Sequence, residues 1–192
     1  EFLDNLKISH TNEISGSQLG SIIQTETPQK ILICDGLRDP GNLGTVIRTA
    51  NALGFDRLIL SADCADVYNP KTVRAAMGAL FRLEMSIVDD IPAAIGELQA
   101  NGYDVRAAAL NENAMPLNTY CVTAHTVFVI GNEGHGLSEE TVTACNGAVI
   151  IPMAEGAESL NAAIEEYQAM APDVTVIATY DSSGTLQTQI EA

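Results

Sequence analysis

The amino-acid sequence predicts an α/β domain built around a mostly parallel sheet. From Lys30 onward, short apolar runs alternate with longer segments whose apolar residues recur at helical spacing, and this alternation is typical of α/β folds. Several of the runs are continuously apolar, as expected for strands that are covered on both faces. A chain of 192 residues is long enough for one such domain with a substantial core.

The expected elements follow one another in a regular order. Strands are expected at residues 31–34, 57–61, 84–88, 104–110, 126–130, 148–151 and 174–180. Helices are expected after Pro40, at residues 70–80 and 91–99, after Ser138, and at residues 159–171. Residues 111–126 are expected to form a longer irregular connection, and the last twelve residues a frayed tail.

Composition and periodicity divide the chain into three parts. Residues 1–29 are polar and mixed and show no persuasive period, so they are interpreted as an arm or linker. Residues 30–171 are expected to form the α/β domain. Residues 172–192 are expected to form an atypical C-terminal strand and tail.

The net charge of the chain is strongly negative. It has 25 acidic and 9 basic residues, for a formal net charge of −16. This charge argues against strong electrostatic binding of nucleic acid by the whole surface. Binding of a polyanion would require a local basic patch on the protein. No apolar run is long enough to span a bilayer, and the first residues lack a basic segment followed by an apolar one. We therefore expect a cytoplasmic protein without membrane attachment.

The cysteines and histidines show neither a CxxC pair nor the spacing of metal ligands. We expect the cysteines to be reduced packing residues and the chain to hold no metal. The residues concerned are Cys34, Cys64, Cys121, Cys145, His10, His125 and His135.

The stretch from Asp35 to Ala50 joins an expected buried strand to an expected helix. Pro40 suits the first turn of that helix, and either Asp39 or Asn42 could cap its free amides. Five residues at helical spacing are expected to form its apolar face. They are Leu43, Val46, Ile47, Ala50 and Leu53.

Arg48 lies off this apolar face, at about 140° from Leu43 on a helical wheel. Gly44 lies one turn before Arg48 on the same side. A glycine there would let a ligand approach the backbone while the guanidinium offers several donors. The alternative is a solvated arginine on an amphipathic helix.

Two further loops follow expected strands. Residues 131–138 contain three glycines and end at Ser138, which can cap a helix with Glu139 and Glu140 in its first turn. After the next strand and the Pro152-Met153 pair that closes it, residues 155–161 form a loop of the same type. Because ligands bind beyond the carboxyl ends of strands in open parallel sheets, these loops are candidates for a binding site.

Together, the three segments resemble the motifs of the SpoU/TrmH branch of the SPOUT superfamily, whose members are knotted RNA ribose 2'-O-methyltransferases. The resemblance covers roughly Lys30 to Ala163, and Asn69 to Arg82 is similar to the connecting segment of that branch. The matching residues are Asn42, Gly44 and Arg48 in the first motif, Gly131, Glu133 and Gly134 in the second, and Ser159, Leu160 and Asn161 in the third.

The resemblance implies a Rossmann-like parallel sheet with a C-terminal deep trefoil knot, which is a rare exception to unthreaded connections. It also implies a homodimer that binds S-adenosylmethionine in the knot and methylates rRNA or tRNA without a metal. The residues expected against the cofactor are Gly131, Gly134, Ile151, Met153 and Leu160. Those expected around the reacting centre are Asn42, Arg48, Glu133 and Asn161, supported by Ser159.

Within this resemblance, Arg48 is expected to stabilise the ribose oxygen as its proton leaves, since a guanidinium normally keeps its own proton and is poorly suited to act as a base. Glu133 would orient Arg48 or accept a proton. Asn42 and Asn161 would position ribose and cofactor, and the alternative for each asparagine is a cap of a helix or turn.

The sequence departs from the family in two places. Many relatives carry an RNA-binding domain of the L30e type, whereas about thirty nondescript residues precede the first motif here. After Ala163 the family continues as a long apolar helix, but this chain becomes polar and then strand-like. Two other readings remain, an S-adenosylmethionine-binding knotted domain without autonomous RNA methylation and an unrelated nucleotide-binding protein. The latter is disfavoured because GxGxxG and a Walker lysine are absent.

Overall fold

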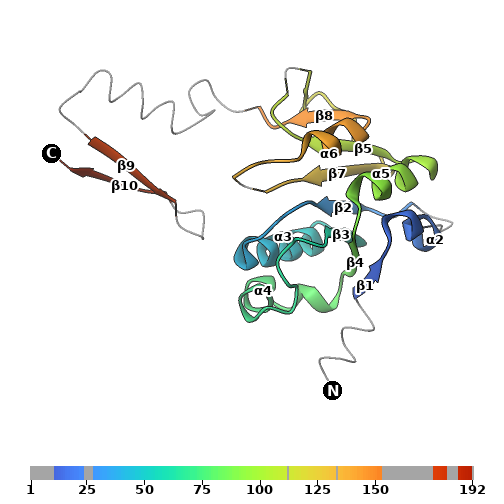
Figure 1. Ribbon diagram of the computed structural model, residues 1–192, viewed down its shortest axis with the longest axis horizontal. Coiled ribbons are helices and arrows are strands. Elements are labelled where there is room, and N and C mark those ends of the chain that lie inside the picture. Colours follow the sequence, from blue (N-terminus) through green and yellow to red (C-terminus); the bar gives the residue numbers. More distant parts are fainter. Residues whose placement is uncertain are drawn as a thin grey trace. The chain divides into compact units, whose positions relative to one another are not determined.

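An eight-stranded sheet forms the centre of the first of two units in this computed structural model (Figure 1). The structure describes residues 11–23, 28–111, 113–132, 134–152, 175–180 and 186–191. The units are Glu1–Ile150 and Ile151–Ala192.

The strand order in the first unit is β1-β4-β3-β2-β7-β5-β8-β6, and every neighbouring pair is parallel. The predicted parallel sheet is therefore confirmed, and the strands expected at 31–34, 57–61, 84–88 and 126–130 have the bounds that were predicted. The strands are β1 Thr11–Ile14, β2 Ile31–Cys34, β3 Arg57–Ser61, β4 Glu84–Val88, β5 Asp104–Ala108, β6 Met115–Pro116, β7 Thr126–Ile130 and β8 Gly147–Ile150.

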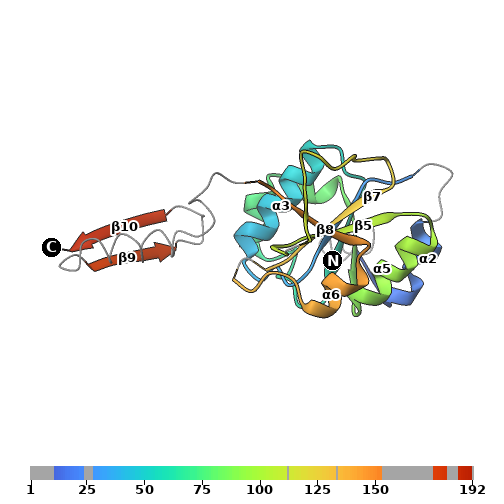
Figure 2. The ribbon, with the colours of Figure 1, turned by 90° about the horizontal axis from the view of Figure 1, so that it is seen from above.

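Helices cover both faces of this sheet (Figures 1 and 2). Helices α3 and α4 lie on one face, and α2, α5 and α6 lie on the other. The helices are α2 Leu19–Ile23, α3 Pro40–Ala52, α4 Pro70–Ala76, α5 Ile91–Ala100 and α6 Glu139–Ala144, with short 3-10 helices η1 Gly16–Gln18 and η2 Ala79–Phe81.

The two faces explain why the central strands are continuously apolar. In β2, Ile31 and Ile33 join the core beneath α2 and α5, whereas Cys34 joins the core beneath α3 and α4. Successive side chains of a strand point to opposite faces, so a strand covered on both sides needs apolar residues at every position. All five residues of β3 are accordingly buried.

Part of the expected N-terminal arm belongs to this unit. Strand β1 extends the sheet by pairing with β4, and Leu19 and Ile23 of α2 are buried in the core. The interpretation as an arm or linker was wrong for residues 11–23, because elements of four and five residues are too short to show a hydrophobic period.

Helix α4 is shorter than predicted. It ends at Ala76 because Met77 and Gly78 both have positive φ, of 51° and 82°, and such a left-handed pair ends a helix. Met77, just past the end of α4, is 74% exposed. Leu80 is buried nevertheless, because η2 turns it back toward the core.

Three smaller expectations were also corrected. The connection at residues 111–126 contains the short strand β6, which pairs with β8. Leu53 was placed on the apolar face of α3, but it is the C-cap residue and is 65% exposed. Strand β5 ends at Ala108 rather than at residue 110.

The second unit contains an antiparallel pair of strands, β9 Thr175–Tyr180 and β10 Leu186–Glu191. The strand expected at 174–180 is confirmed to within one residue. The frayed tail was a wrong expectation for residues 186–191, which form β10. The helix expected at 159–171 and the knot to which it would contribute lie outside the described residues.

Candidate active site

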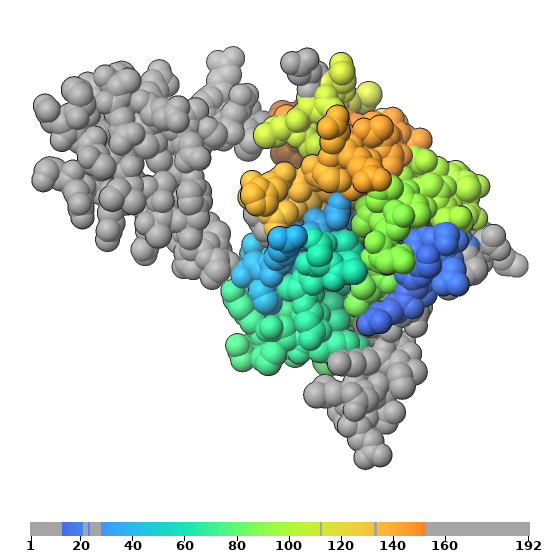
Figure 3. Space-filling view, in the orientation of Figure 1, coloured from blue at the N-terminus to red at the C-terminus, as the bar shows by residue number. Residues whose placement is uncertain are grey.

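Strands β2 and β7 are adjacent and parallel, so the loops after them begin at the same edge of the sheet. We call residues 35–39 the β2 loop and residues 131–137 the glycine loop. The Asp35 amide donates to the Ile130 carbonyl at 2.9 Å, which continues the pairing with β7 into the first residue of the β2 loop. The space-filling view shows the glycine loop (gold) beside the residues that lead into α3 (blue) (Figure 3).

The β2 loop ends in a capped helix. Asp39 is the N-cap of α3, and its Oδ1 accepts a hydrogen bond from the Asn42 amide at 2.8 Å. This decides between the two candidate caps in favour of Asp39, so Asn42 lies within the first turn. Lys71 donates to Asp39 Oδ2 at 2.8 Å, and this bond, helped by the Asn42 amide, lowers the pKa of the Asp39 carboxyl.

Arg48 lies two turns further along α3 and is exposed. Within the part of the chain that the structure describes, its guanidinium makes no hydrogen bond or ion pair. Arg48 therefore lies off the buried face of α3, as the helical wheel predicted.

Gly44 has a different role from the one expected. It is buried, and a Cβ at this position would lie 2.5 Å from the Thr72 carbonyl oxygen and 2.6 Å from the Ala75 Cβ of α4. The side of α3 around Gly44 is thus covered by α4, and the expected ligand approach at Gly44 was wrong. The missing side chain allows two helices to pack closely.

The glycine loop is closed by its own backbone. Asn132 and Gly136 form an antiparallel bridge, with N to O distances of 3.1 and 2.8 Å. Asn132 Oδ1 also accepts from the amides of Gly134 at 2.8 Å and His135 at 3.3 Å. A Cβ at Gly131 would lie 2.5 Å from the Gly136 carbonyl group, so this tight closure requires glycine at position 131.

Helix α6 begins directly after the glycine loop, and Ser138 caps it by accepting from the Thr141 amide at 3.1 Å. This cap was predicted. The Thr141 hydroxyl donates to Asp35 Oδ2 at 2.9 Å, so the start of α6 is tied to the β2 loop. Thr141 is 2% exposed.

A cavity of about 240 Å³ lies between the two loops. Arg38 and Asp63 line it and form an exposed ion pair at 2.9 Å. Hydrogen bonds from Ser61 and then Arg38 lower the pKa of the Asp63 carboxyl. His135 and Asn132 line the cavity from the glycine loop.

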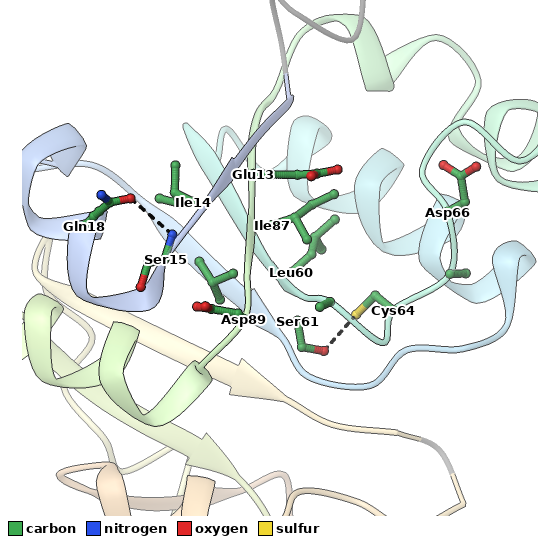
Figure 4. Close-up of a pocket in the computed structure, with 13 residues that line it drawn as sticks. Glu13, Ile14, Ser15, Gln18, Leu60, Ser61, Cys64, Asp66, Ile87 and Asp89 are labelled. Atoms are coloured by element: carbon green, nitrogen blue, oxygen red, sulfur yellow. Dashed lines mark hydrogen bonds between the residues drawn. The ribbon is translucent and has the colours of Figure 1, made fainter.

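A larger pocket, of about 590 Å³, lies at the carboxyl ends of β1, β3 and β4 (Figure 4). Its lining includes the carboxylates Glu13, Asp66 and Asp89. An acidic lining suits neither a phosphate nor an RNA backbone, and the sequence motifs are not among its lining residues.

Four of the predicted site residues lie on two connected segments of the structure. Asn42 and Arg48 lie on α3, and Gly131 and Gly134 lie in the glycine loop, which is hydrogen-bonded to the β2 loop that leads into α3. None of the four lines the cavity between the two loops. Ile151 directly follows β8 and is 69% exposed. The other predicted residues lie outside the described part of the chain. They are Glu133, Met153, Ser159, Leu160 and Asn161.

Sequence reasoning missed three residues that join the loops: Asp35, Asn132 and Thr141. Asn132 had a local signal, because an asparagine two residues before a glycine often bonds the backbone ahead of it. Asp35 and Thr141 had none, since they meet only in the folded chain.

Comparison with known proteins identifies the family. The model of the SpoU rRNA Methylase family matches residues 29–164. The chain belongs to this family. It is 33% identical over 168 residues to the 23S rRNA (guanosine(2553)-2'-O)-methyltransferase RlmP of Bacillus subtilis, covering 79% of this chain and 67% of that protein. It is 38% identical over 136 residues to the 23S rRNA (uridine(2479)-2'-O)-methyltransferase of Streptomyces viridochromogenes, covering 69% and 47%.

Solved structures of SpoU proteins have the same fold. The SpoU methyltransferase AviRb from Streptomyces viridochromogenes, in complex with AdoMet, aligns with a TM-score of 0.63 and 35% identity over 74% of this chain and 58% of that one. An AdoMet-bound rRNA methyltransferase from Sinorhizobium meliloti aligns with a TM-score of 0.65 and 34% identity over 77% and 56%. The chain thus spans between about half and two thirds of these SpoU relatives.

These findings confirm the predicted family and its parallel α/β fold. Among the residues that the structure describes, no helix is long and apolar enough to cross a membrane. The same residues include no group of three or more side chains suited to hold a metal ion.

Proposed function

We propose that this chain is the catalytic domain of an RNA methyltransferase that transfers a methyl group from S-adenosylmethionine to a ribose 2'-hydroxyl of rRNA or tRNA. The observation that carries the proposal is the connection between the segments of two SpoU motifs. The loop that leads into the helix with Asn42 and Arg48 is hydrogen-bonded to the loop with Gly131 and Gly134. The relatives named as 2'-O-methyltransferases and the AdoMet-bound structures support it.

The glycine loop suits a ligand that contacts backbone. A Cβ at Gly136 would meet nothing within 4 Å, and one at Gly134 would meet only the Asn132 side chain, at 3.4 Å. The exposed Ile151 offers an apolar surface of the kind that an adenine ring contacts. When bound, S-adenosylmethionine would supply a sulfonium methyl group whose carbon an oxygen nucleophile can attack, with S-adenosylhomocysteine as the leaving group. Gly131, Gly134, Ile151, Met153 and Leu160 would hold it.

Side chains of this protein would stabilise the reacting oxygen and position the ribose. The 2'-oxygen loses its proton as it forms the bond to the methyl carbon, and the loss of the proton makes negative charge develop on it during the transfer. Arg48 would stabilise that charge with its fixed, protonated guanidinium. Glu133 would orient Arg48 or take up the proton, while Asn42 and Asn161, supported by Ser159, would align the ribose.

Binding of RNA would rely on a segment that holds most of the basic residues of the chain. Six of the nine basic residues lie between Arg38 and Arg82, against four acidic residues there, a difference of +2. Arg48, Lys71 and Arg74 are exposed on the packed pair α3 and α4. Lys71 is paired with Asp39, so Arg48 and Arg74 would supply most of the local positive charge that a chain of net charge −16 needs to approach phosphates.

We expect the chain to bind S-adenosylhomocysteine, the demethylated product, at one site per chain. Isothermal titration calorimetry with the product measures this directly. No heat at millimolar ligand would contradict the proposed cofactor site. Binding without methylation of any RNA would instead favour the alternative of an S-adenosylmethionine-binding domain that does not methylate RNA on its own.

We also expect a homodimer. Leu110 and Val122, in the connections around β6, are 76% and 57% exposed, and exposed apolar side chains of this size are often covered by a partner. Sedimentation equilibrium at micromolar protein should give twice the 20.3 kDa of one chain. A mass of only 20.3 kDa at micromolar protein would contradict this.

A cytoplasmic location is part of the proposal. The four cysteines are free, as expected for a reducing compartment. Burial raises the pKa of the Cys145 thiol to about 11, so this cysteine packs rather than reacts.

A further inference from the structure

Asn132 joins the glycine loop to the β2 loop through one side chain. Its Nδ2 donates to the Gly36 carbonyl oxygen at 2.9 Å. Its Oδ1 accepts from the amides of Gly134 and His135, at 2.8 and 3.3 Å. The two ends of the amide therefore act on different loops: the oxygen shapes the glycine loop, and the nitrogen holds the β2 loop.

Gly36 is a sensitive point in the β2 loop. Its φ is +70°, a conformation that glycine adopts freely, so the loop has little intrinsic preference of its own here. On the side of β3, the Gly36 amide donates to Ser61 Oγ at 2.8 Å. Asn132 binds the carbonyl group of the same residue from the side of β7. Three residues later, Asp39 caps the helix that carries Arg48.

On the basis of the proposed function, we propose that Asn132 is a positioning residue. It would keep Arg48 correctly placed relative to the bound cofactor. The glycine loop would hold the cofactor, and α3 carries the group that stabilises the reacting oxygen. The Asn132 to Gly36 bond is a direct side-chain link between these two parts of the site. A small displacement between them would misalign the transfer, since misplacement by about 1 Å can cost roughly a hundredfold in rate.

Two substitutions separate the functions of the two ends of the amide. Asn132→Asp keeps an acceptor for the Gly134 and His135 amides but replaces the donor to Gly36 by an oxygen, which repels the carbonyl. Asn132→Ser is uncharged and can still accept from the loop amides, but it is too short to reach Gly36. Asn132→Ala removes both functions.

For Asn132→Asp and Asn132→Ser we expect the dissociation constant for S-adenosylhomocysteine to stay within about threefold of the parent, while kcat for RNA methylation falls at least roughly tenfold. For Asn132→Ala we expect cofactor affinity to fall as well. A parent-like kcat in Asn132→Ser would overturn the proposal, because it would trace the aspartate effect to charge. Loss of cofactor binding in both Asn132→Asp and Asn132→Ser would also overturn the proposal, because Asn132 would then only shape the glycine loop.

Gln99→Glu is the matched control. Gln99 Nε2 donates to the Ala144 carbonyl at 2.8 Å, tying α5 to the end of α6. The control therefore removes an amide donor to a backbone carbonyl and adds the same charge, but outside the site. We expect a parent-like kcat for it. If Gln99→Glu lowers kcat as much as Asn132→Asp, the effect is one of general stability and the proposal fails.

Hydrogen exchange tests the link without cofactor or RNA. The Asp35 and Gly36 amides are both hydrogen-bonded, so their exchange reports on the β2 loop. In Asn132→Asp we expect faster exchange at residues 35–39 and unchanged exchange at residues 134–136. Unchanged exchange at 35–39 would overturn the link. This readout stays valid if the parent chain methylates no RNA, which would reject the proposed function and not the link.

Discussion

Arg48→Ala is expected to slow RNA methylation by roughly a hundredfold or more while leaving the affinity for S-adenosylhomocysteine nearly intact. The reason is that charge on the ribose oxygen appears only in the transition state, so a group that stabilises it affects rate and not ground-state binding. Arg48 is exposed on α3, and its guanidinium is not engaged within the described residues. The measurement is tritiated methyl incorporation into RNA from cells lacking the enzyme, followed by mapping of the methylated ribose.

Two further variants make this result specific. Arg48→Lys should recover little of the rate, since a point charge cannot replace a planar fork of donors. Arg74→Ala removes an exposed arginine from the neighbouring helix α4 and should weaken RNA binding and raise KM without a comparable loss of kcat. Methylation by Arg48→Ala at the parent rate would show that the role assigned to Arg48 is wrong.

Gly44→Ala is expected to destabilise the chain by about 2 kcal/mol, since the added methyl group overpacks the contact between α3 and α4. The methyl carbon would lie 2.5 Å from a backbone oxygen, that of Thr72, which cannot turn away as a side chain can. Because α3 carries Asn42 and Arg48, methylation should fall together with stability. Urea unfolding at 25 °C measures the change through the midpoint and the slope.

Gly96→Ala is the matched control, because it makes the same substitution inside a helix. In α5, a Cβ at Gly96 would meet nothing within 4 Å. This variant should be more stable than the parent by about 0.5 to 1 kcal/mol, since alanine favours the helix. Equal effects of the two substitutions would show that helix propensity, and not the close approach of α3 to α4, governs position 44.

The sequence was sufficient to predict the central strands, because their burial on both faces leaves a clear pattern of apolar residues. The runs at β2, β3 and β7 are apolar at nearly every position because helices cover both faces of the sheet. A parallel sheet in turn requires crossover connections, which appear in the sequence as the alternating helical segments. The Ser138 cap was predictable because a capping bond spans only three residues.

The parts that were not predicted depend on neighbours distant in sequence. Gly44 looked open because a helical wheel contains no second helix, and α4 covers it. Strand β1 is recognisable only through its pairing with β4, and the Asn132 to Gly36 bond joins residues 96 positions apart. Such features require the folded chain, because neither partner carries a local mark of the other.

The pairing of β2 with β7 has a consequence for how the domain is made. Leu32 pairs with Phe128 and Thr11 pairs with Met85, so the centre and one edge of the sheet close only through contacts of long range along the chain. During synthesis on the ribosome, almost a hundred residues are added after β2 before its neighbour β7 is complete. Domains with such high contact order fold slowly, because closing long loops costs entropy before native contacts compensate for it. The nascent chain therefore exposes one edge of β2 during synthesis, when chaperones can bind it.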